Sequence, residues 1–309
     1  MSSRPVVLVT EHLSDAPLQW LAERADVVQA PAGSGEFARA APDAEALLVR
    51  TYTRVDAALL ARLPRVRVVA RAGVGLDNID AQACAARGVA VVNTPDANTQ
   101  AVVEFVLCLL CDALRPRVFL ESAVEPARWN ELRARTVAHR QMDELQLGIL
   151  GMGRIGRRVA QVARAIGMRV AYCDLLEIEP AHRHGAHPLD AAELLRTSDV
   201  VTVHIDGRPS NRGFLGEALL AQLRPDAVLI NTSRGMVVDH EALARRLREC
   251  PGMLALLDVH EPEPIAASNP LLGLTNARLS PHLASRTDAA MEAMSWVVRD
   301  LWNALQRGG

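Results

Sequence analysis

The amino-acid sequence predicts an α/β protein with two domains, each built on a parallel sheet. Short β-branched and apolar runs alternate with helical patterns along most of the chain, which is the rhythm of βαβ units. Most of these runs lack the polar alternation of half-exposed strands, as expected when helices cover both faces of a sheet. The length of 309 residues favours two cores over one, and half of the residues are apolar, which is enough to build both.

The first domain is expected to end near residue 97. The segment NTPDANTQ at 93–100 is rich in turn residues and breaks the strand–helix rhythm, so we interpret it as a hinge. A long apolar helix is expected directly after it, over 101–114. The expected strands of the first domain lie at 6–10, 46–49, 66–70 and 89–93.

The second domain is expected over 98–284, and no strand-like run occurs between 115 and 145. In the final segment, apolar residues from Met291 to Leu305 recur at helical spacing. We expect this helix to pack back on the first domain, which would then comprise 1–97 plus 285–309. The expected strands of the second domain lie at 147–150, 169–174, 199–204, 227–232, 253–259 and 277–280.

Composition excludes several classes of function. The net charge of −2 argues against a nucleic-acid surface built on bulk positive charge. All 34 basic residues are Arg, so chemistry that needs a catalytic or phosphate-binding Lys is excluded. No apolar run approaches the roughly 20 residues that span a bilayer, and the N-terminal run is too short for a signal peptide. Charge and hydropathy together predict no nucleic-acid or membrane partner. The five cysteines are odd in number and scattered, which indicates a reduced, cytoplasmic protein.

The stretch LGILGMGRIGRRVA at 147–160 combines a strand, a glycine turn and a helix face. Gly151 permits the tight turn, Gly153 lets the backbone approach a pyrophosphate, and Gly156 allows close helix–strand packing. Asp174 ends the next expected strand, where a carboxylate can accept hydrogen bonds from ribose hydroxyls. Leucines follow it rather than an Arg that would neutralise a 2′-phosphate, which favours NAD over NADP. A glycine turn used only for packing is the alternative.

Three later strands deliver chemically useful side chains to the edge where open parallel sheets bind ligands. Arg234 follows one strand, Asp258 and Glu263 follow the next, and His282 follows the last. A guanidinium can hold a substrate carboxylate, and an imidazolium beside a carboxylate can protonate a carbonyl oxygen. Each residue alone is more often a surface charge or a loop histidine, but their joint appearance predicts hydride transfer to a 2-oxo acid. Arg50, Thr51 and Tyr52 follow a strand of the first domain and are candidate specificity residues.

Five motifs carry a resemblance to a known family. They are RAGVGLDNID at 71–80, GILGMGRIG at 148–156, NTSRGMVVD at 231–239, LDVHEPEP at 257–264 and SPHLA at 280–284. In these motifs and their order the chain resembles the D-isomer-specific 2-hydroxyacid dehydrogenases, such as phosphoglycerate dehydrogenase, glyoxylate/hydroxypyruvate reductase and D-lactate dehydrogenase. The resemblance implies two Rossmann-like domains, the first flavodoxin-like, with a cleft between them. It also implies NAD as cofactor, a homodimer, and interconversion of a small 2-oxo acid with its D-2-hydroxy acid.

The resemblance also implies roles for individual residues. Arg234, Glu263 and His282 would be catalytic, with Glu263 and His282 as the acid/base pair. Backbone amides around Gly73, Val74 and Gly75 would face the substrate together with Arg234, His282 and Tyr52. Asp258 would contact the nicotinamide carboxamide. The full set of expected cofactor-binding residues is Gly151, Gly153, Arg154, Ile155, Gly156, Asp174, His204, Thr232, Ser233, Arg234, Asp258, His282 and Ala284.

Some features depart from the family pattern or allow other interpretations. Asp206 stands where relatives commonly have Pro, and Ala284 replaces a commoner Gly. Glu263 replaces the Gln of formate dehydrogenases, which favours carbonyl reduction over formate oxidation. An NAD-sensing or corepressor-like protein on the same fold is the alternative function. Amino-acid dehydrogenases and S-adenosylhomocysteine hydrolases are disfavoured because they generally rely on Lys.

Two clusters are expected to carry no chemistry. His182, His184 and His187 lack a nearby Cys or carboxylate that would complete a tetrahedral set, so no metal site is expected. Cys108 and Cys111 form C-x-x-C inside an apolar helix, and we interpret them as buried small side chains. For the substrate, few cationic groups in the first domain favour glyoxylate, hydroxypyruvate or an apolar 2-oxo acid over a phosphorylated one.

Overall fold

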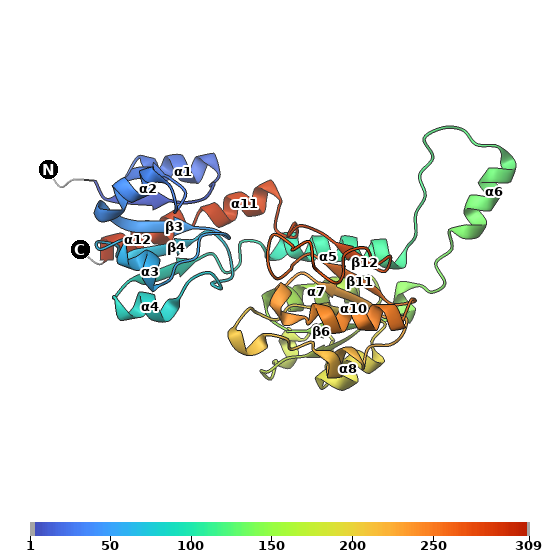
Figure 1. Cartoon of the computed structure of the whole chain (residues 1–309). Helices are drawn as coiled ribbons and strands as arrows, with labels where there is room; N and C mark the ends of the chain where they lie inside the picture. The colour runs from blue at the N-terminus through green and yellow to red at the C-terminus, as the bar shows by residue number, and fades with distance from the viewer. Residues whose placement is uncertain (1–3, 308–309) are drawn as a thin grey trace. The chain divides into compact units, whose positions relative to one another are not determined.

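The computed structural model describes residues 4–307, which divide into two compact units (Figure 1). The first unit comprises residues 4–98 and 285–307, and the second comprises residues 99–284. Each unit is built on one parallel sheet covered by helices, so the predicted α/β fold class is confirmed. Within residues 4–307, every helix falls short of the length and apolarity that a bilayer span requires.

The sheet of the first unit has five strands in the order β2-β1-β3-β4-β5, which is the flavodoxin-like order. Strand β2 was not predicted, because it is a four-residue edge strand whose two ends are exposed. Helices α1 (Asp15–Ala22), α2 (Gly35–Ala40), α3 (Ala57–Ala61) and α4 (Ala81–Ala86) connect the strands. The strands are β1 (Val6–Val9), β2 (Asp26–Gln29), β3 (Ala44–Val49), β4 (Val68–Arg71) and β5 (Ala90–Asn93).

The C-terminal segment packs on the first unit as two helices, α11 (Asp288–Ser295) and α12 (Val298–Arg307). Leu301 and Leu305 of α12 are buried in one apolar cluster with Val7 and Leu48 of the sheet. This cluster covers one face of the sheet, and a second cluster around Phe37 covers the other. Because both faces of the sheet are buried, the sequences of its strands are continuous apolar runs without polar alternation.

The sheet of the second unit has seven parallel strands in the order β12-β11-β10-β9-β6-β7-β8. The chain enters at β6, builds outward to β8, and returns to the other side of β6 with β9, so the strand order reverses between β6 and β9. Such a switch point is where doubly wound sheets bind ligands. The strands are β6 (Gln146–Leu150), β7 (Arg169–Cys173), β8 (His187–Pro188), β9 (Val200–Val203), β10 (Val228–Asn231), β11 (Leu254–Leu257) and β12 (Ala277–Leu279).

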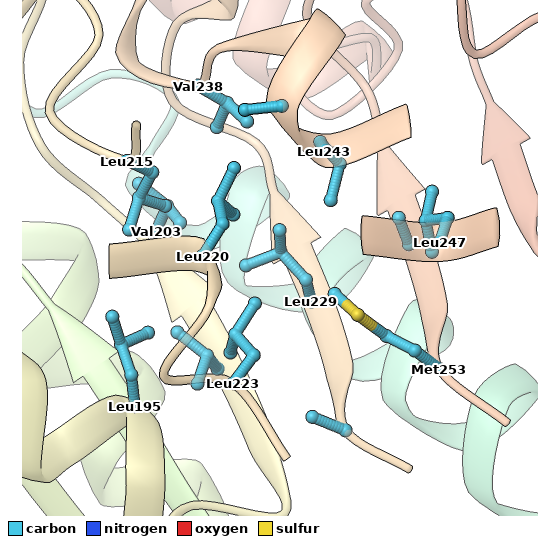
Figure 2. Packing of buried hydrophobic residues seen from close by; sticks show 14 of the residues in the cluster. Leu195, Val203, Leu215, Leu220, Leu223, Leu229, Val238, Leu243, Leu247 and Met253 are labelled. Carbon is cyan, nitrogen blue, oxygen red and sulfur yellow. The ribbon is translucent and has the colours of Figure 1, made fainter. Parts of the chain in front are cut away.

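Helices cover both faces of this second sheet. On one face, Leu229 of the sheet packs with Leu243 and Leu247 of a helix, as Figure 2 shows. On the other face, Val106 and Ile149 share a cluster with residues of two further helices. The carboxyl ends of the strands therefore remain as the edge at which polar side chains collect. The helices are α5 (Thr99–Leu114), α7 (Arg154–Ala165), α8 (Ala191–Thr197), α9 (Glu217–Leu220) and α10 (His240–Glu249).

The segment between α5 and β6 contains no strand, as expected. It contains one α-helix, α6 (Pro126–Arg135), which has no buried residue and stands apart from the sheet in Figure 1. Cys108 was expected to be buried, and this was wrong: it lies exposed on α5, and Cys111 is half-buried. The helix is apolar on most of its positions, so its sequence pattern does not reveal which face stays exposed.

Candidate active site

The glycine turn after β6 has the conformation and packing that a phosphate-binding turn needs. Gly151 has a φ of +93°, and a Cβ on it would lie 2.7 Å from the carbonyl oxygen of His204. A Cβ on Gly156 would lie 2.1 Å from the carbonyl oxygen of Gly151, so the first turn of α7 packs directly on the glycine turn. Both glycines are therefore required by the fold itself.

Gly153 is different, because a Cβ on it would meet no atom of the protein within 4 Å. It is the N-cap residue of α7, and no described side chain caps this helix start. Arg154, the first residue of the helix, is exposed, and Ile155 is half-buried beside it. An open glycine at an uncapped helix N-terminus fits the pyrophosphate of a dinucleotide, since N–H groups and the helix dipole face an anion there.

Asp174 follows β7 and binds the glycine turn. Its carboxylate accepts hydrogen bonds from the N–H groups of Met152 at 2.5 Å and Leu176 at 2.9 Å. Leu175 and Leu176 beside it are largely exposed, so apolar surface adjoins the carboxylate. The pKa of Arg208 is raised, mainly by its hydrogen bond to Asp206 and also by the nearby charge of Asp174. The sequence analysis did not single out this Arg, because it lies in the loop after β9, more than thirty positions from Asp174.

His204, expected at the cofactor, follows β9. Burial lowers its pKa to about 3, so the ring is neutral at physiological pH. One ring nitrogen, Nε2, lies 3.0 Å from the hydroxyl of Thr202. The other, Nδ1, is buried without a hydrogen-bond partner among residues 4–307.

The turn after β10 carries Arg234 and is organised by Asn231, a residue that sequence reasoning did not single out. The fully buried Asn231 side chain accepts from the N–H and hydroxyl of Ser233 and donates to the carbonyl oxygen of Arg234 at 3.0 Å. Arg234 is half-buried and donates to the carbonyl oxygen of Ser233 at 2.7 Å. The hydroxyl of Thr232 is buried with no partner in the described part of the chain, which leaves it available to a cofactor.

The Arg234 turn packs directly against the segment that follows β11. A Cβ on Gly235 would lie 2.1 Å from the carbonyl carbon of His260, so only glycine fits here. His260 in turn donates from Nε2 to the carbonyl oxygen of Ser280 at 2.8 Å. The ends of β10, β11 and β12, which are neighbours in the sheet, are thus joined into one polar cluster.

His282 and Glu263 form a close pair in this cluster. His282 Nδ1 lies 2.8 Å from Glu263 Oε2, and Glu263 Oε1 accepts the N–H of His260 at 3.0 Å. Partial burial raises the pKa of Glu263, but the hydrogen bonds from His282 and His260 outweigh it and hold the pKa below its ordinary value. The carboxylate therefore stays ionised at neutral pH and presents its charge to the imidazole.

Asp258 holds the turn that carries His282. Its carboxylate has no exposed surface and accepts the N–H groups of Leu283 and Ala284, both at 2.8 Å, and the hydroxyl of Ser280. The backbone also ties this turn, because the His282 N–H donates to the carbonyl oxygen of Asp258 at 2.9 Å. Asp258 is therefore a structural anchor, and its contact with the nicotinamide carboxamide remains a prediction. Ala284 is buried behind this turn, with its side chain in the apolar core.

The expected substrate residues of the first unit lie at the carboxyl ends of β3 and β4. Gly73 has a φ of +150°, and Val74 accepts a hydrogen bond from the side chain of Asn93 at 2.7 Å. Val74 and Gly75 are half-buried, whereas Tyr52 is exposed on the loop after β3. These residues belong to one unit, and Arg234, Glu263 and His282 belong to the other.

Among the described residues, no group of three or more His, Cys, Asp or Glu side chains is arranged to hold a metal ion. On the surface of the second unit, His182 ends a short 3-10 turn, His184 follows it, and His187 begins β8. His182 Nδ1 lies 3.6 Å from Glu179 Oε2.

Comparison with known proteins decides the family. Residues 107–284 match the D-isomer specific 2-hydroxyacid dehydrogenase family in its NAD binding domain. This chain belongs to that family. The match covers β6 to β12 and therefore includes the glycine turn and the residues Arg234, Glu263 and His282.

Similar proteins extend the match over nearly the whole chain. A glyoxylate reductase of Aeropyrum pernix is 36% identical over 99% of this chain and 94% of its own length. A D-3-phosphoglycerate dehydrogenase of Archaeoglobus fulgidus is 32% identical over 95% of this chain, which spans only 56% of that protein. A D-lactate dehydrogenase of Aquifex aeolicus, solved with NAD and lactic acid, superposes with a TM-score of 0.83 at 25% identity, over 98% of this chain and 96% of its own.

The different surroundings of Gly153 and Gly156 give a testable contrast. Gly153→Ala should fold as the wild type does, because its Cβ meets no protein atom. It should bind NADH about tenfold or more weakly, because the Cβ occupies the approach to the pyrophosphate. Gly156→Ala should be destabilised by about 1–3 kcal/mol, since its Cβ would overlap a backbone carbonyl. Thermal unfolding and NADH fluorescence titration measure both effects, and unchanged NADH affinity in Gly153→Ala would rule out this site.

Proposed function

We propose that this protein is an NAD-dependent reductase that interconverts a small 2-oxo acid and its D-2-hydroxy acid. The observation that carries the proposal is the His282–Glu263 pair, 2.8 Å apart, at the same sheet edge as Arg234 and the glycine turn. Family membership supports the reaction class. The similar glyoxylate reductase supports small 2-oxo acids as substrates.

In this proposal His282 is the acid/base group. Its Nδ1 is held by Glu263, which leaves Nε2 to exchange a proton with the substrate oxygen. His282 gives a proton to the carbonyl oxygen during reduction and takes one from the hydroxyl group during oxidation, while the ionised Glu263 holds the ring through Nδ1. Positioned proton transfer of this kind is typically worth about 10²–10⁴ in rate.

Arg234 is proposed to bind the substrate carboxylate. A guanidinium offers two parallel N–H donors to a carboxylate, which fixes the orientation of the neighbouring carbonyl group. The buried Asn231 and the close packing at Gly235 hold the turn that presents Arg234. The backbone amides around Gly73, Val74 and Gly75 of the first unit are further proposed as substrate-binding groups.

The residues after β6, β7 and β10 fit a dinucleotide, and NAD is the proposed form. When bound, the nicotinamide supplies the hydride that reduces the substrate carbon. Asp174 would accept hydrogen bonds from the ribose hydroxyls. Leu175 and Leu176 offer apolar surface beside it for the adenine. Thr232 and Ser233, with His204 and Ala284, would lie along the remainder of the cofactor.

Turnover assays test the proposed reaction. The wild type should oxidise NADH in the presence of glyoxylate, hydroxypyruvate or an apolar 2-oxo acid. His282→Ala should lose about 10²-fold or more in kcat while binding NADH almost normally, because the ring donates a proton without holding the cofactor. A wild type that binds NADH but turns over no 2-oxo acid would instead favour a sensor or corepressor.

The ionised state of Glu263 predicts an activity effect. Its lowered pKa keeps the carboxylate charged, and Oε2 lies 2.8 Å from His282 Nδ1. Glu263→Gln removes this charge, so kcat for reduction should fall about tenfold or more. The matched control is Glu261→Gln, which removes a carboxylate that pairs with Arg212 in the same segment. An unchanged kcat in Glu263→Gln would contradict the acid/base pair.

The protein is further proposed to act in the cytoplasm. All five cysteines are unpaired, and Cys108 is exposed, which suits a reducing compartment.

We also propose that the protein is a homodimer assembled through the second unit. The segment 115–140, which contains α6, leaves Val118, Phe119 and Trp129 largely exposed. Exposed apolar side chains gathered on a projecting segment mark a protein–protein surface, since water is a poor solvent for them. The family resemblance favours a second copy of the chain as the partner.

Phe119→Glu should weaken this dimer. A buried aromatic anchor at an interface is worth about 2 kcal/mol or more, so the charge should raise the dimer dissociation constant more than about tenfold. Analytical ultracentrifugation measures the change. Leu272→Glu, at an exposed leucine outside the segment, should leave the dimer intact. Equal behaviour of both variants would argue against this surface.

A further inference from the structure

Glu11 follows β1, and its side chain accepts hydrogen bonds from four consecutive backbone N–H groups. Oε1 accepts from Arg50 at 3.1 Å, Tyr52 at 3.2 Å and Thr53 at 3.0 Å. Oε2 accepts from Thr51 at 2.9 Å and Tyr52 at 3.1 Å. The loop 50–53 is thus wrapped around a single carboxylate.

Two carbonyl groups of the same loop, at its two ends, also accept hydrogen bonds. Arg71 Nε donates to the carbonyl oxygen of Arg50 at 3.1 Å, and Asn78 donates to the carbonyl oxygens of Arg50 and Thr53 at 3.1 and 2.7 Å. The hydroxyls of Thr10 and Thr53 lie 2.8 Å apart. Hydrogen bonds therefore hold both the N–H groups and some of the carbonyl groups of this loop.

The ordering of this loop is not explained by the apolar core. Tyr52 is 78% exposed, and Thr51 is exposed beside it, so the outward side chains bury little apolar surface. Burial raises the pKa of Glu11, but the four N–H donors outweigh it and lower the pKa below its ordinary value. The carboxylate is therefore ionised at neutral pH, and its hydrogen bonds are of the strong, charge-assisted kind.

Arg71 connects the loop to the segment that is expected to face the substrate. A Cβ on Gly73 would lie only 1.8 Å from Arg71 Nη1, so the guanidinium rests against this glycine. The same side chain holds the carbonyl oxygen of Arg50. Since β3 and β4 are neighbours, the loop after β3 and the segment 73–75 after β4 form one surface at the sheet edge.

We propose that Glu11 is a positioning residue for substrate binding: its carboxylate fixes the loop 50–53 so that Arg50 and Tyr52 stand ready for the 2-oxo acid. This inference rests on the proposed function. The N–H groups of the loop already donate to Glu11, so the loop would recognise the substrate through its side chains. Glu11 itself would act without touching the substrate.

Hydrogen exchange followed by mass spectrometry tests the structural half of the inference without any turnover. Glu11→Gln keeps one acceptor oxygen but loses the charge and the second oxygen. The amides of residues 50–53 should then exchange about tenfold or more faster, while those of β1 and β3 stay protected and show that the unit is folded. Glu23→Gln, at an exposed carboxylate that pairs with Arg24, is the matched control and should exchange as the wild type does.

Steady-state kinetics tests the functional half. Glu11→Gln should raise KM for the 2-oxo acid about tenfold, with a smaller change in kcat. The Kd for NADH should stay unchanged, because the proposed cofactor residues belong to the other unit. Tyr52→Ala removes an exposed side chain, so it should fold normally, raise KM similarly, and leave the exchange of residues 50–53 unchanged.

The outcomes separate this inference from the proposed function. Faster exchange in Glu11→Gln without a change in KM would make Glu11 merely structural and overturn the inference, as would unchanged exchange. An unchanged KM in Tyr52→Ala would overturn it as well, even if Glu11→Gln failed to fold. A wild type that reduced no 2-oxo acid would instead remove the proposed function, and the positioning role would fall with it.

Discussion

The geometry of the second unit's polar edge depends on the buried carboxylate of Asp258. A carboxyl side chain with no exposed surface is costly to bury unless hydrogen-bond donors surround it. Its donors are the Ser280 hydroxyl and the N–H groups of Leu283 and Ala284, which flank His282 on both sides. Moving the His282 turn would leave the buried oxygens of Asp258 without these donors. Asp258 therefore fixes the backbone from which the His282 side chain meets Glu263, with Nδ1 and Oε2 2.8 Å apart.

The glycines of this edge show how one residue type meets two different demands. Gly151, Gly156 and Gly235 lie where a Cβ would overlap a backbone atom, so the fold alone requires them. Gly153 lies in open space, and nothing in the packing explains its lack of a side chain. A glycine that the fold does not require, at the uncapped start of α7, indicates a ligand that approaches the backbone.

The sequence predicted the fold class and the ends of most strands, because both depend on local apolar runs and on the glycine turn. It missed β2 and β8, which are short edge strands with little apolar surface to bury. It singled out Arg234, Asp258, Glu263 and His282 but not Asn231, Ser280 or Glu11, which hold the loops at the two sheet edges. Asn231 acts through its own turn, while Ser280 and Glu11 meet partners more than twenty positions away, and only the folded sheet brings these together.

A shared principle links the carboxylates at the two sheet edges. Loops after parallel strands leave N–H groups without ladder partners, and Glu11, Asp174 and Asp258 each accept such groups from a neighbouring loop. Every N–H group that donates to one of these carboxylates is occupied and cannot hold a bound anion. No side chain caps the first turn of α7, so its N–H groups can donate to a phosphate. The N–H groups of the loop 50–53 already donate to Glu11. An anionic ligand at that loop must therefore be recognised by side chains. Thr51 and Tyr52 are exposed there, and the half-buried Arg50 is held beside them by a hydrogen bond from Nη1 to the carbonyl oxygen of His12 at 3.0 Å.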